Sequence, residues 1–165
     1  MEKTQTNPAS AARRVDPRLT GSAIGSGPFE LSYLNIEEFA QHQVRFAGRL
    51  LGAIAFSATR PAITEPACPY AWVNMPVLAG DAVFEVWTSS TLVVREQAHG
   101  LTAARNDDLM FGCLTIEPGG MLDKASFSAY SRIFDFIDQH DYGHLLRAWN
   151  YVPQINADEN GLERY

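Results

Sequence analysis

The sequence predicts an α+β domain in which a mixed sheet carries helices packed on one face. Several short segments between Phe29 and Ile116 have the alternating pattern of strands, and one long helical pattern follows them. A run of strands followed by a helix–strand–helix unit is typical of α+β layers. The chain has 165 residues, of which 46% are hydrophobic, so one domain can bury a core of its own.

Composition and charge narrow the class of partner. The net charge of −6 argues against a broad nucleic-acid surface. No apolar run approaches the roughly 18–20 residues that span a bilayer, and the N-terminus lacks the apolar core of a secretory signal. Cys68 and Cys113 are far apart in the sequence and match no metal motif. We therefore expect a cytoplasmic protein without a metal, membrane or nucleic-acid partner.

The first part of the chain predicts an arm and two strands. Residues 1–27 are rich in Ser, Thr, Ala, Gly and Pro, so we expect a disordered arm. The fold begins at residues 29–35, FELSYLN, whose alternation predicts a strand. Residues 36–43 fit either one helical turn or a loop. Residues 44–57 are apolar, and their two glycines favour a strand with a bulge or bend over a helix.

The middle of the chain predicts further strands. Residues 59–70 hold three prolines and form a loop. Residues 71–78 predict a weak strand, at an edge or bulged, because its proline cannot donate to a ladder. Residues 82–90, AVFEVWTSS, predict a strong strand with two alternating faces. Residues 92–99 fit a strand or a connector. In residues 100–116 a polar break precedes the strand LMFGCLTI.

The last third predicts a helix and then a strand. The helix covers residues 123–140, with Asp123 as its N-cap. Large side chains recur at spacings of three and four and share one face: Phe127, Tyr130, Phe134 and Ile137. Residues 144–152 alternate, which predicts a strand that joins the sheet. Leu162 begins a further helix, so we expect a domain that is incomplete at its C-terminus, with one side of the first helix exposed.

One strand face carries candidate binding residues. Arg147, Trp149 and Tyr151 point the same way in the predicted strand. An arginine among aromatic rings suits a carboxylate-bearing ring compound, because guanidinium binds carboxylate bidentately and the rings stack. A core face whose arginine reaches an edge carboxylate explains the same pattern, and the residues alone favour it.

Other residues with chemical potential have simpler explanations. His140 and His144 have the spacing of a helical metal pair, but Gly143 ends the helix between them, so we expect a capping or strand-entry role for both. Cys113 lies in mid-strand, where a thiol is an inert apolar group, and Gly112 beside it marks a close approach to a ligand or a neighbouring strand. Asn150 and Asn156 are turn or bulge residues, for which no ligand is expected.

Two runs carry a resemblance to a known family. HLLRAWNYVPQINADENGLERY, residues 144–165, and FGCLTIEP, residues 111–118, resemble the chorismatase family. The resemblance covers roughly Phe29 to Tyr165. It implies a RidA (YjgF)-like, chorismate-mutase-like fold, present as two domains in a chain about twice this length, a size that suits two domains. The sequence then looks like the first half only, with an arm at 1–27 and a truncated N-terminal RidA-like domain at 28–165.

The resemblance also implies a function. Chorismatases convert chorismate to pyruvate plus a hydroxybenzoate (3- or 4-hydroxybenzoate) or a dihydroxycyclohexadiene acid, without metal or organic cofactor. The general acid/base and most arginines of the family lie in the C-terminal half, so the catalytic residues remain unknown here and the fragment alone is expected to be inactive. The substrate-binding candidates are Arg147, Trp149, Tyr151 and Arg164.

The expected partners are chorismate, the C-terminal half of the same polypeptide and, in a homo-oligomer, further copies. Arg164 belongs to the LERY element, which begins the last predicted helix. It faces either a domain or subunit seam or the solvent. A second hypothesis is a stand-alone, trimeric RidA-type module that binds small molecules or deaminates imines.

Overall fold

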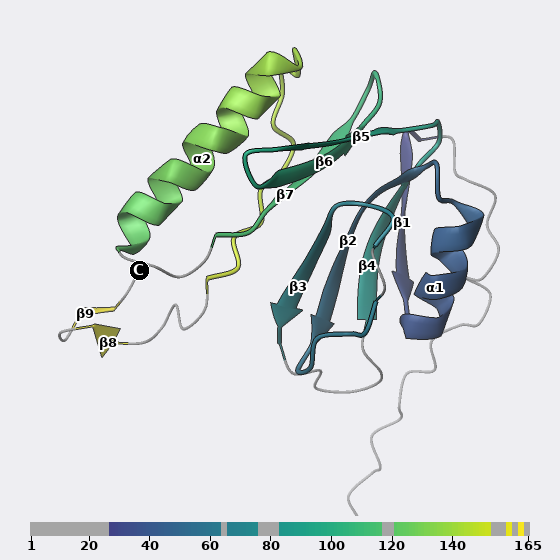
Figure 1. The fold of residues 1–165 in the computed structure, drawn as a ribbon, viewed down its shortest axis with the longest axis horizontal. Helices are drawn as coiled ribbons and strands as arrows, with labels where there is room; N and C mark the ends of the chain where they lie inside the picture. Colours follow the sequence, from purple (N-terminus) through teal and green to yellow (C-terminus); the bar gives the residue numbers. More distant parts are fainter. Residues whose placement is uncertain are drawn as a thin grey trace, which may run out of the picture.

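The computed structural model describes the following parts of the chain: residues 27–63, 66–75, 83–116, 121–152, 158–159 and 162–163. Residues 1–26 of the predicted arm lie outside the described residues, and so do Asn156 and Arg164. The α+β class is confirmed, because two helices accompany mixed and antiparallel sheets (Figure 1). Neither of the described helices is long and apolar enough to cross a membrane.

The elements follow one another in the order that the strand and helix patterns largely predict. They are β1 (Phe29–Leu34), α1 (Ile36–Arg45), β2 (Leu50–Ser57), β3 (Tyr70–Asn74), β4 (Val83–Ser89), β5 (Val94–Ala98), β6 (Leu101–Arg105), β7 (Met110–Leu114), α2 (Leu122–Gln139), β8 (Asp158–Glu159) and β9 (Leu162–Glu163).

Two sheets form the body of the domain. Sheet A has the order β1-β4-β2-β3, in which β2 and β3 are parallel and the other pairs are antiparallel. Sheet B is the antiparallel meander β5-β6-β7. Strand β3 lies at an edge, and β2 has a register shift between Leu50 and Gly52, so the expected edge strand and the expected bulge are both present. The single mixed sheet that the sequence predicts is instead divided in two.

Helix α1 covers one face of sheet A. Asn35 and Glu38 form a capping box, in which the Asn35 side chain accepts from the Glu38 N–H and the Glu38 carboxylate accepts from the Asn35 N–H, both at 2.9 Å. This cap fixes the start of a helix of 10 residues, where the sequence left a single turn or a loop open. Phe39 of the helix stacks on Phe84 of β4 with ring centroids 4.4 Å apart, and both rings are buried.

Helix α2 packs on sheet B through a different face from the one expected. Phe136 is buried against Leu101 and Ala103 of β6, and Ile133 packs beside it. Phe127 and Phe134, which the periodicity placed on the shared apolar face, are 77% and 45% exposed. A spacing of three and four identifies residues that share a side of a helix, but not the side that meets the sheet.

The start of α2 also differs from the expected cap. Its N-cap is Met121, which makes no side-chain capping bond. Asp123 lies inside the first turn, where its carboxylate accepts the N–H of Lys124 at 2.7 Å. A carboxylate in the first turn still interacts favourably with the helix dipole, so the residue type fits the position although its role is not that of the cap.

Three further expectations about strands are corrected. Strand β6 was not predicted, because its sequence LTAAR lacks large alternating side chains. Residues 144–152 have no regular secondary structure and belong to no sheet among the described residues. Leu162 begins strand β9, paired with β8, where we expected a helix. The residues between β8 and β9 in the sequence are Asn-Gly, the dipeptide that most favours a two-residue hairpin.

The two sheets meet at a glycine. Gly52 on β2 is buried, and a Cβ atom placed on it would overlap the ring of Phe111 on β7. The Phe111 ring also lies 5.0 Å from the ring of Trp87 on β4, measured between centroids. The absence of a side chain at Gly52 therefore allows an aromatic ring of sheet B to lie directly on the backbone of sheet A.

We expect Gly52→Ala to destabilise the domain by about 1–3 kcal/mol, the usual cost of overpacking a filled core. Urea unfolding measures this difference in the free energy of unfolding. Gly143→Ala is the matched control, since no atom lies within 4 Å of a Cβ placed there. A loss no larger for Gly52→Ala than for the control would contradict the close contact with Phe111.

Candidate functional site

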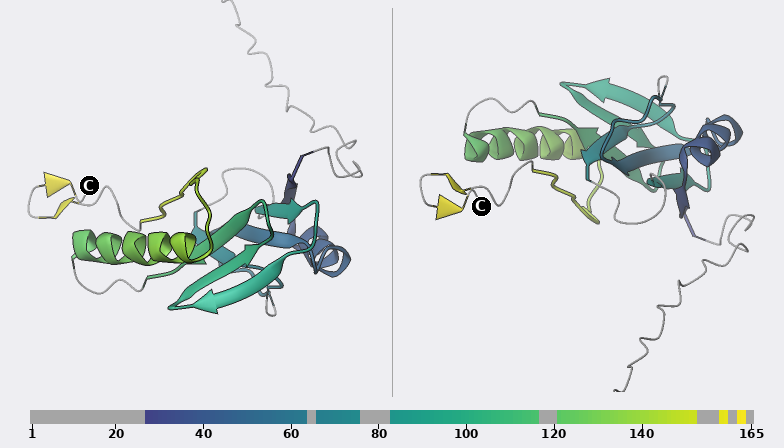
Figure 2. Two further views of the ribbon diagram at one scale, coloured as in Figure 1. Left: turned by 90° about the horizontal axis from the view of Figure 1, so that it is seen from above. Right: turned by 90° about the horizontal axis from the view of Figure 1, so that it is seen from below.

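The site is built on the segment that follows α2. Residues 142–152, here called the returning segment, run back alongside α2 on the flank away from β5 (Figure 2). The Tyr142 hydroxyl donates to the backbone carbonyls of Asn106 and Leu109. Near the other end, the Asn150 amide donates to the Tyr130 hydroxyl of α2 at 2.8 Å. Side-chain hydrogen bonds hold this segment where the sequence predicted a ladder.

The returning segment places the predicted residues on sheet A. The ring of Trp149 lies 5.5 Å from that of Trp87, and the ring of Tyr151 meets Phe56 edge-on at 6.0 Å. The guanidinium of Arg147 lies over the Trp149 ring, 5.0 Å from its centroid. Asn150 bonds to α2 instead. The structure thus brings the three candidates together, and the period of two predicted correctly which side chains share a side.

These side chains lie on the face of sheet A opposite α1. Along β4, Phe84 and Val86 belong to the cluster under α1, whereas Trp87 packs with Ile54 in a separate cluster. Leu31 and Tyr33 are in register with Trp87 and Glu85 and therefore share their face. We call this surface the open face and define it by these residues: Leu31, Tyr33, Phe56, Glu85, Trp87, Arg147, Trp149 and Tyr151.

Glu85 is the one carboxyl group among the residues that define the open face, and it was not among the candidates predicted from the sequence. Burial raises the pKa of Glu85 above its ordinary value, although the nearby Arg147 guanidinium acts to lower it. Burial also raises the pKa of Tyr151, the Glu85 carboxylate raises it further, and Arg147 opposes both. The three groups therefore lie within reach of one another's charge. The sequence contained one signal for Glu85: it is an acidic residue in an apolar strand, and it points to the same side of that strand as Trp87.

The arrangement suits an aromatic or ring-shaped carboxylate. The Arg147 side chain is exposed, and Trp149 and Tyr151 remain 36% and 41% exposed, so a guanidinium and two ring systems are accessible together. A guanidinium over an indole ring has a fixed plane, which favours bidentate binding of a carboxylate. Glu85 supplies a carboxyl group near the Arg147 guanidinium.

His140 has a capping position, one of the two roles that we expected for the histidines. Helix α2 ends at Gln139, His140 is its C-cap, and its Nε2 lies 3.2 Å from the Glu96 carboxylate. Arg105 Nε lies 3.4 Å from the same carboxylate oxygen. His144 is exposed in the returning segment. Among the described residues, no three His, Cys, Asp or Glu side chains gather as a metal site.

Both thiols are poor nucleophiles. Burial raises the pKa of Cys68 to about 12, and it also raises the pKa of Cys113. The Cys113 thiol donates to the carbonyl of Tyr70 at 3.5 Å. Gly112 makes no unusually close approach, since its nearest neighbouring atom would lie 3.8 Å from an added Cβ. The close approach that we expected at Gly112 occurs at Gly52.

Asn106 joins the parts that support the open face. Its amide donates to Ser89 Oγ at 2.8 Å and to Thr91 Oγ1 at 2.9 Å. Its side-chain oxygen accepts the N–H groups of Asp108 and Leu109. Its backbone carbonyl accepts the Tyr142 hydroxyl. One residue of the β6–β7 turn thus connects the end of β4 to the returning segment.

Residues 85–165 match the protein family described as "Chorismatase FkbO/Hyg5-like, N-terminal". A 3-hydroxybenzoate synthase of Streptomyces hygroscopicus is 27% identical over 94 residues, which are 56% of this chain and 28% of that protein. A chorismatase crystal structure at 1.08 Å resolution is similar with a TM-score of 0.69 and 24% identity, over 83% of this chain and 41% of that one. The matched parts of the chain therefore span less than half the length of each of these relatives.

The matched sequence is similar to the N-terminal part of chorismatases, and the fold is similar to that of a chorismatase. The resemblance to the chorismatase family that the two sequence runs carry is confirmed by the family match and by the similarity to the 3-hydroxybenzoate synthase. The match begins at Glu85 and includes the returning segment, so it contains both the carboxylate and the guanidinium of the open face.

We expect Asn106→Ala to lower the free energy of unfolding by about 1–3 kcal/mol, because several polar groups lose their partner at once. Chemical denaturation measures the loss. Asp107→Ala, at the exposed neighbouring position, is the control. Equal effects of the two substitutions would show that the Asn106 hydrogen bonds contribute little.

The raised pKa of Glu85 predicts a pH-dependent effect of Glu85→Gln. The folded state binds the Glu85 proton more tightly than the unfolded chain, so wild-type stability decreases as pH rises from the unfolded pKa through the folded one. The Gln variant lacks this loss. Its free energy of unfolding relative to wild type should therefore increase between about pH 4 and about pH 7.

The control is Glu30→Gln, which removes one negative charge from the opposite face of sheet A, in register with Thr88. Denaturation curves at both pH values are compared for the three proteins. A relative stability of Glu85→Gln that falls with rising pH would mean that attraction to Arg147 outweighs burial.

Proposed function

We propose that the chain is the N-terminal domain of a two-domain chorismatase. The complete protein would convert chorismate to pyruvate plus a hydroxybenzoate, 3- or 4-hydroxybenzoate, or a dihydroxycyclohexadiene acid. The family match over residues 85–165 carries this proposal, and the similarity to a 3-hydroxybenzoate synthase supports it. We also propose that the domain has a RidA-like fold and that the protein is cytoplasmic.

Conversion of chorismate has two chemical requirements. Its enol ether must be protonated, and its two carboxylates must be bound. The described residues offer groups for the second requirement, the binding of carboxylates. Arg147 would hold one carboxylate, while Trp149 and Tyr151 present ring surfaces to the substrate. The general acid/base is expected in the C-terminal half, against which this domain would pack, and the reaction would use no metal or organic cofactor.

A stand-alone RidA-type module is the second candidate. The family match and the chorismatase structure favour the two-domain enzyme over this module. Light scattering of the 165-residue chain separates the two ideas, because a stable trimer of the chain alone is the expectation of the module only.

The test is an assay of the complete protein with chorismate, in which released pyruvate and the hydroxybenzoate are both quantified. We expect pyruvate release by the complete protein and little by residues 1–165 alone. Absence of pyruvate release from well-folded complete protein would reject the chorismatase proposal.

Arg147→Met should raise the KM for chorismate by roughly tenfold or more, since one charge-assisted carboxylate contact is lost. Arg45→Met is the matched control, because the Arg45 guanidinium also lies over a ring, 4.9 Å from the centroid of Phe46, at the end of α1. The same KM for both variants would remove Arg147 from substrate binding and leave the reaction itself standing.

A further inference from the structure

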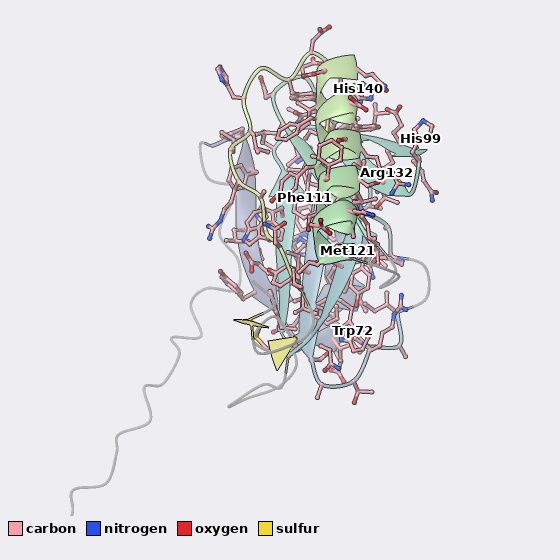
Figure 3. All side chains as sticks on the ribbon, turned by 90° about the vertical axis from the view of Figure 1, so that its left-hand side faces the viewer. Trp72, His99, Phe111, Met121, Arg132 and His140 are labelled. Carbon is pink, nitrogen blue, oxygen red and sulfur yellow. The ribbon has the colours of Figure 1, made fainter. Side chains whose placement is uncertain are left out.

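A second concave site lies between α2 and the β5–β6 hairpin. It has a volume of about 300 Å³. Its lining residues are Ala98, His99, Leu101, Arg132, Asp135, Phe136 and Gln139. His99 and Arg132 lie on the flank of α2 that faces away from the returning segment (Figure 3). This groove is therefore separate from the open face.

The groove has an apolar floor and a charged rim. Leu101 and Phe136 are buried beneath it, with exposed fractions of 4% and 5%. Arg132, Asp135 and Gln139 are exposed on successive turns of α2 and form one side of the rim. A ligand in this groove would meet apolar surface below and polar groups above, which is the composition of a small-molecule site.

The two opposite charges of the rim, Arg132 and Asp135, form no ion pair with each other among the described residues. Arg132 and Asp135 are three residues apart on α2 and are neighbours on its surface. Within the described part of the chain, neither side chain takes part in a hydrogen bond or an ion pair. One positive and one negative group thus face the same groove at about one turn's separation.

The hairpin turn brings the opposite rim close to Arg132. His99 and Gly100 have φ angles of 51° and 81°, so the turn has the left-handed backbone that glycine favours. A Cβ placed on Gly100 would lie 3.8 Å from Nη2 of Arg132. The guanidinium therefore reaches across the groove towards the turn, and the His99 side chain lines the groove beside it.

We propose that this groove binds a free α-amino acid with an apolar side chain. Arg132 would bind the carboxylate, Asp135 would bind the ammonium group, and the side chain would lie on Leu101 and Phe136. A simple anion would leave Asp135 unpaired, and a simple cation would leave Arg132 unpaired, whereas a zwitterion matches both. The volume is at the lower end of the range for ligand sites, which fits a ligand of this size.

The first experiment titrates the 165-residue chain with L-phenylalanine as the probe and follows backbone amide shifts by NMR. Saturable shifts are expected at residues 98–101 and 132–139. 3-Phenylpropionate lacks the ammonium group and 2-phenylethylamine lacks the carboxylate, so each should bind roughly tenfold more weakly or worse. Absence of saturable shifts in these ranges, or equal binding of either analogue, would overturn the proposal.

The second experiment repeats the titration with Arg132→Gln and Asp135→Asn. Both side chains are exposed, so circular dichroism should show unchanged folding. Each variant should weaken L-phenylalanine binding by roughly tenfold. Asp138→Asn removes an exposed charge of the same helix outside the groove and should bind as wild type does. Unchanged binding by either groove variant would overturn the assignment. Because the readout is binding, its outcome is independent of chorismate turnover.

Discussion

The contact of Phe111 with the backbone at Gly52 is the constraint on which the open face depends. It seats sheet B on sheet A, and the same Phe111 ring supports Trp87 from one side at 5.0 Å. Trp149 then rests against Trp87 at 5.5 Å and carries the guanidinium of Arg147 on its own ring. A side chain at position 52 would push out the first ring of this series, so the position of Arg147 depends on a residue that it does not touch.

Aromatic packing alone would not fix the direction of the returning segment. Polar contacts at its two ends fix this direction. Tyr142 is bonded to the β6–β7 turn, and Asn150 is bonded to Tyr130 of α2. Rotation of the intervening side chains onto the other side of the segment would break these contacts. Partial burial on this face also explains why the pKa of Glu85 is raised above its ordinary value, although the nearby Arg147 acts to lower it.

Local patterns in the sequence predicted which side chains share a side, and they failed where distant residues decide. The alternation of β4 and of residues 147–151 needed only neighbours in the chain, and both alternations are observed. The pairing of the returning segment depends on Tyr130 and Asn106, which lie 20 and 36 residues from their partners. Glu85 is partly buried and lies near Arg147 only in the folded chain, so the one local signal for it was an acidic residue in an apolar strand. Helix α1 is a different case, because its capping box is formed by Asn35 and Glu38, which are close in the sequence and suffice to predict the helix start.

The returning segment has a further consequence for the local stability of the domain. Residues 143–152 make no backbone hydrogen bond to another strand among the described residues, and most of them are exposed. Opening of this segment breaks a few side-chain contacts and no ladder, so its free energy of opening lies far below that of global unfolding. We therefore expect fast exchange of the amide hydrogens in the segment that carries Arg147, Trp149 and Tyr151. An induced-fit step at the open face would cost little, since a ligand or a docking domain would stabilise a conformation that is already only loosely held.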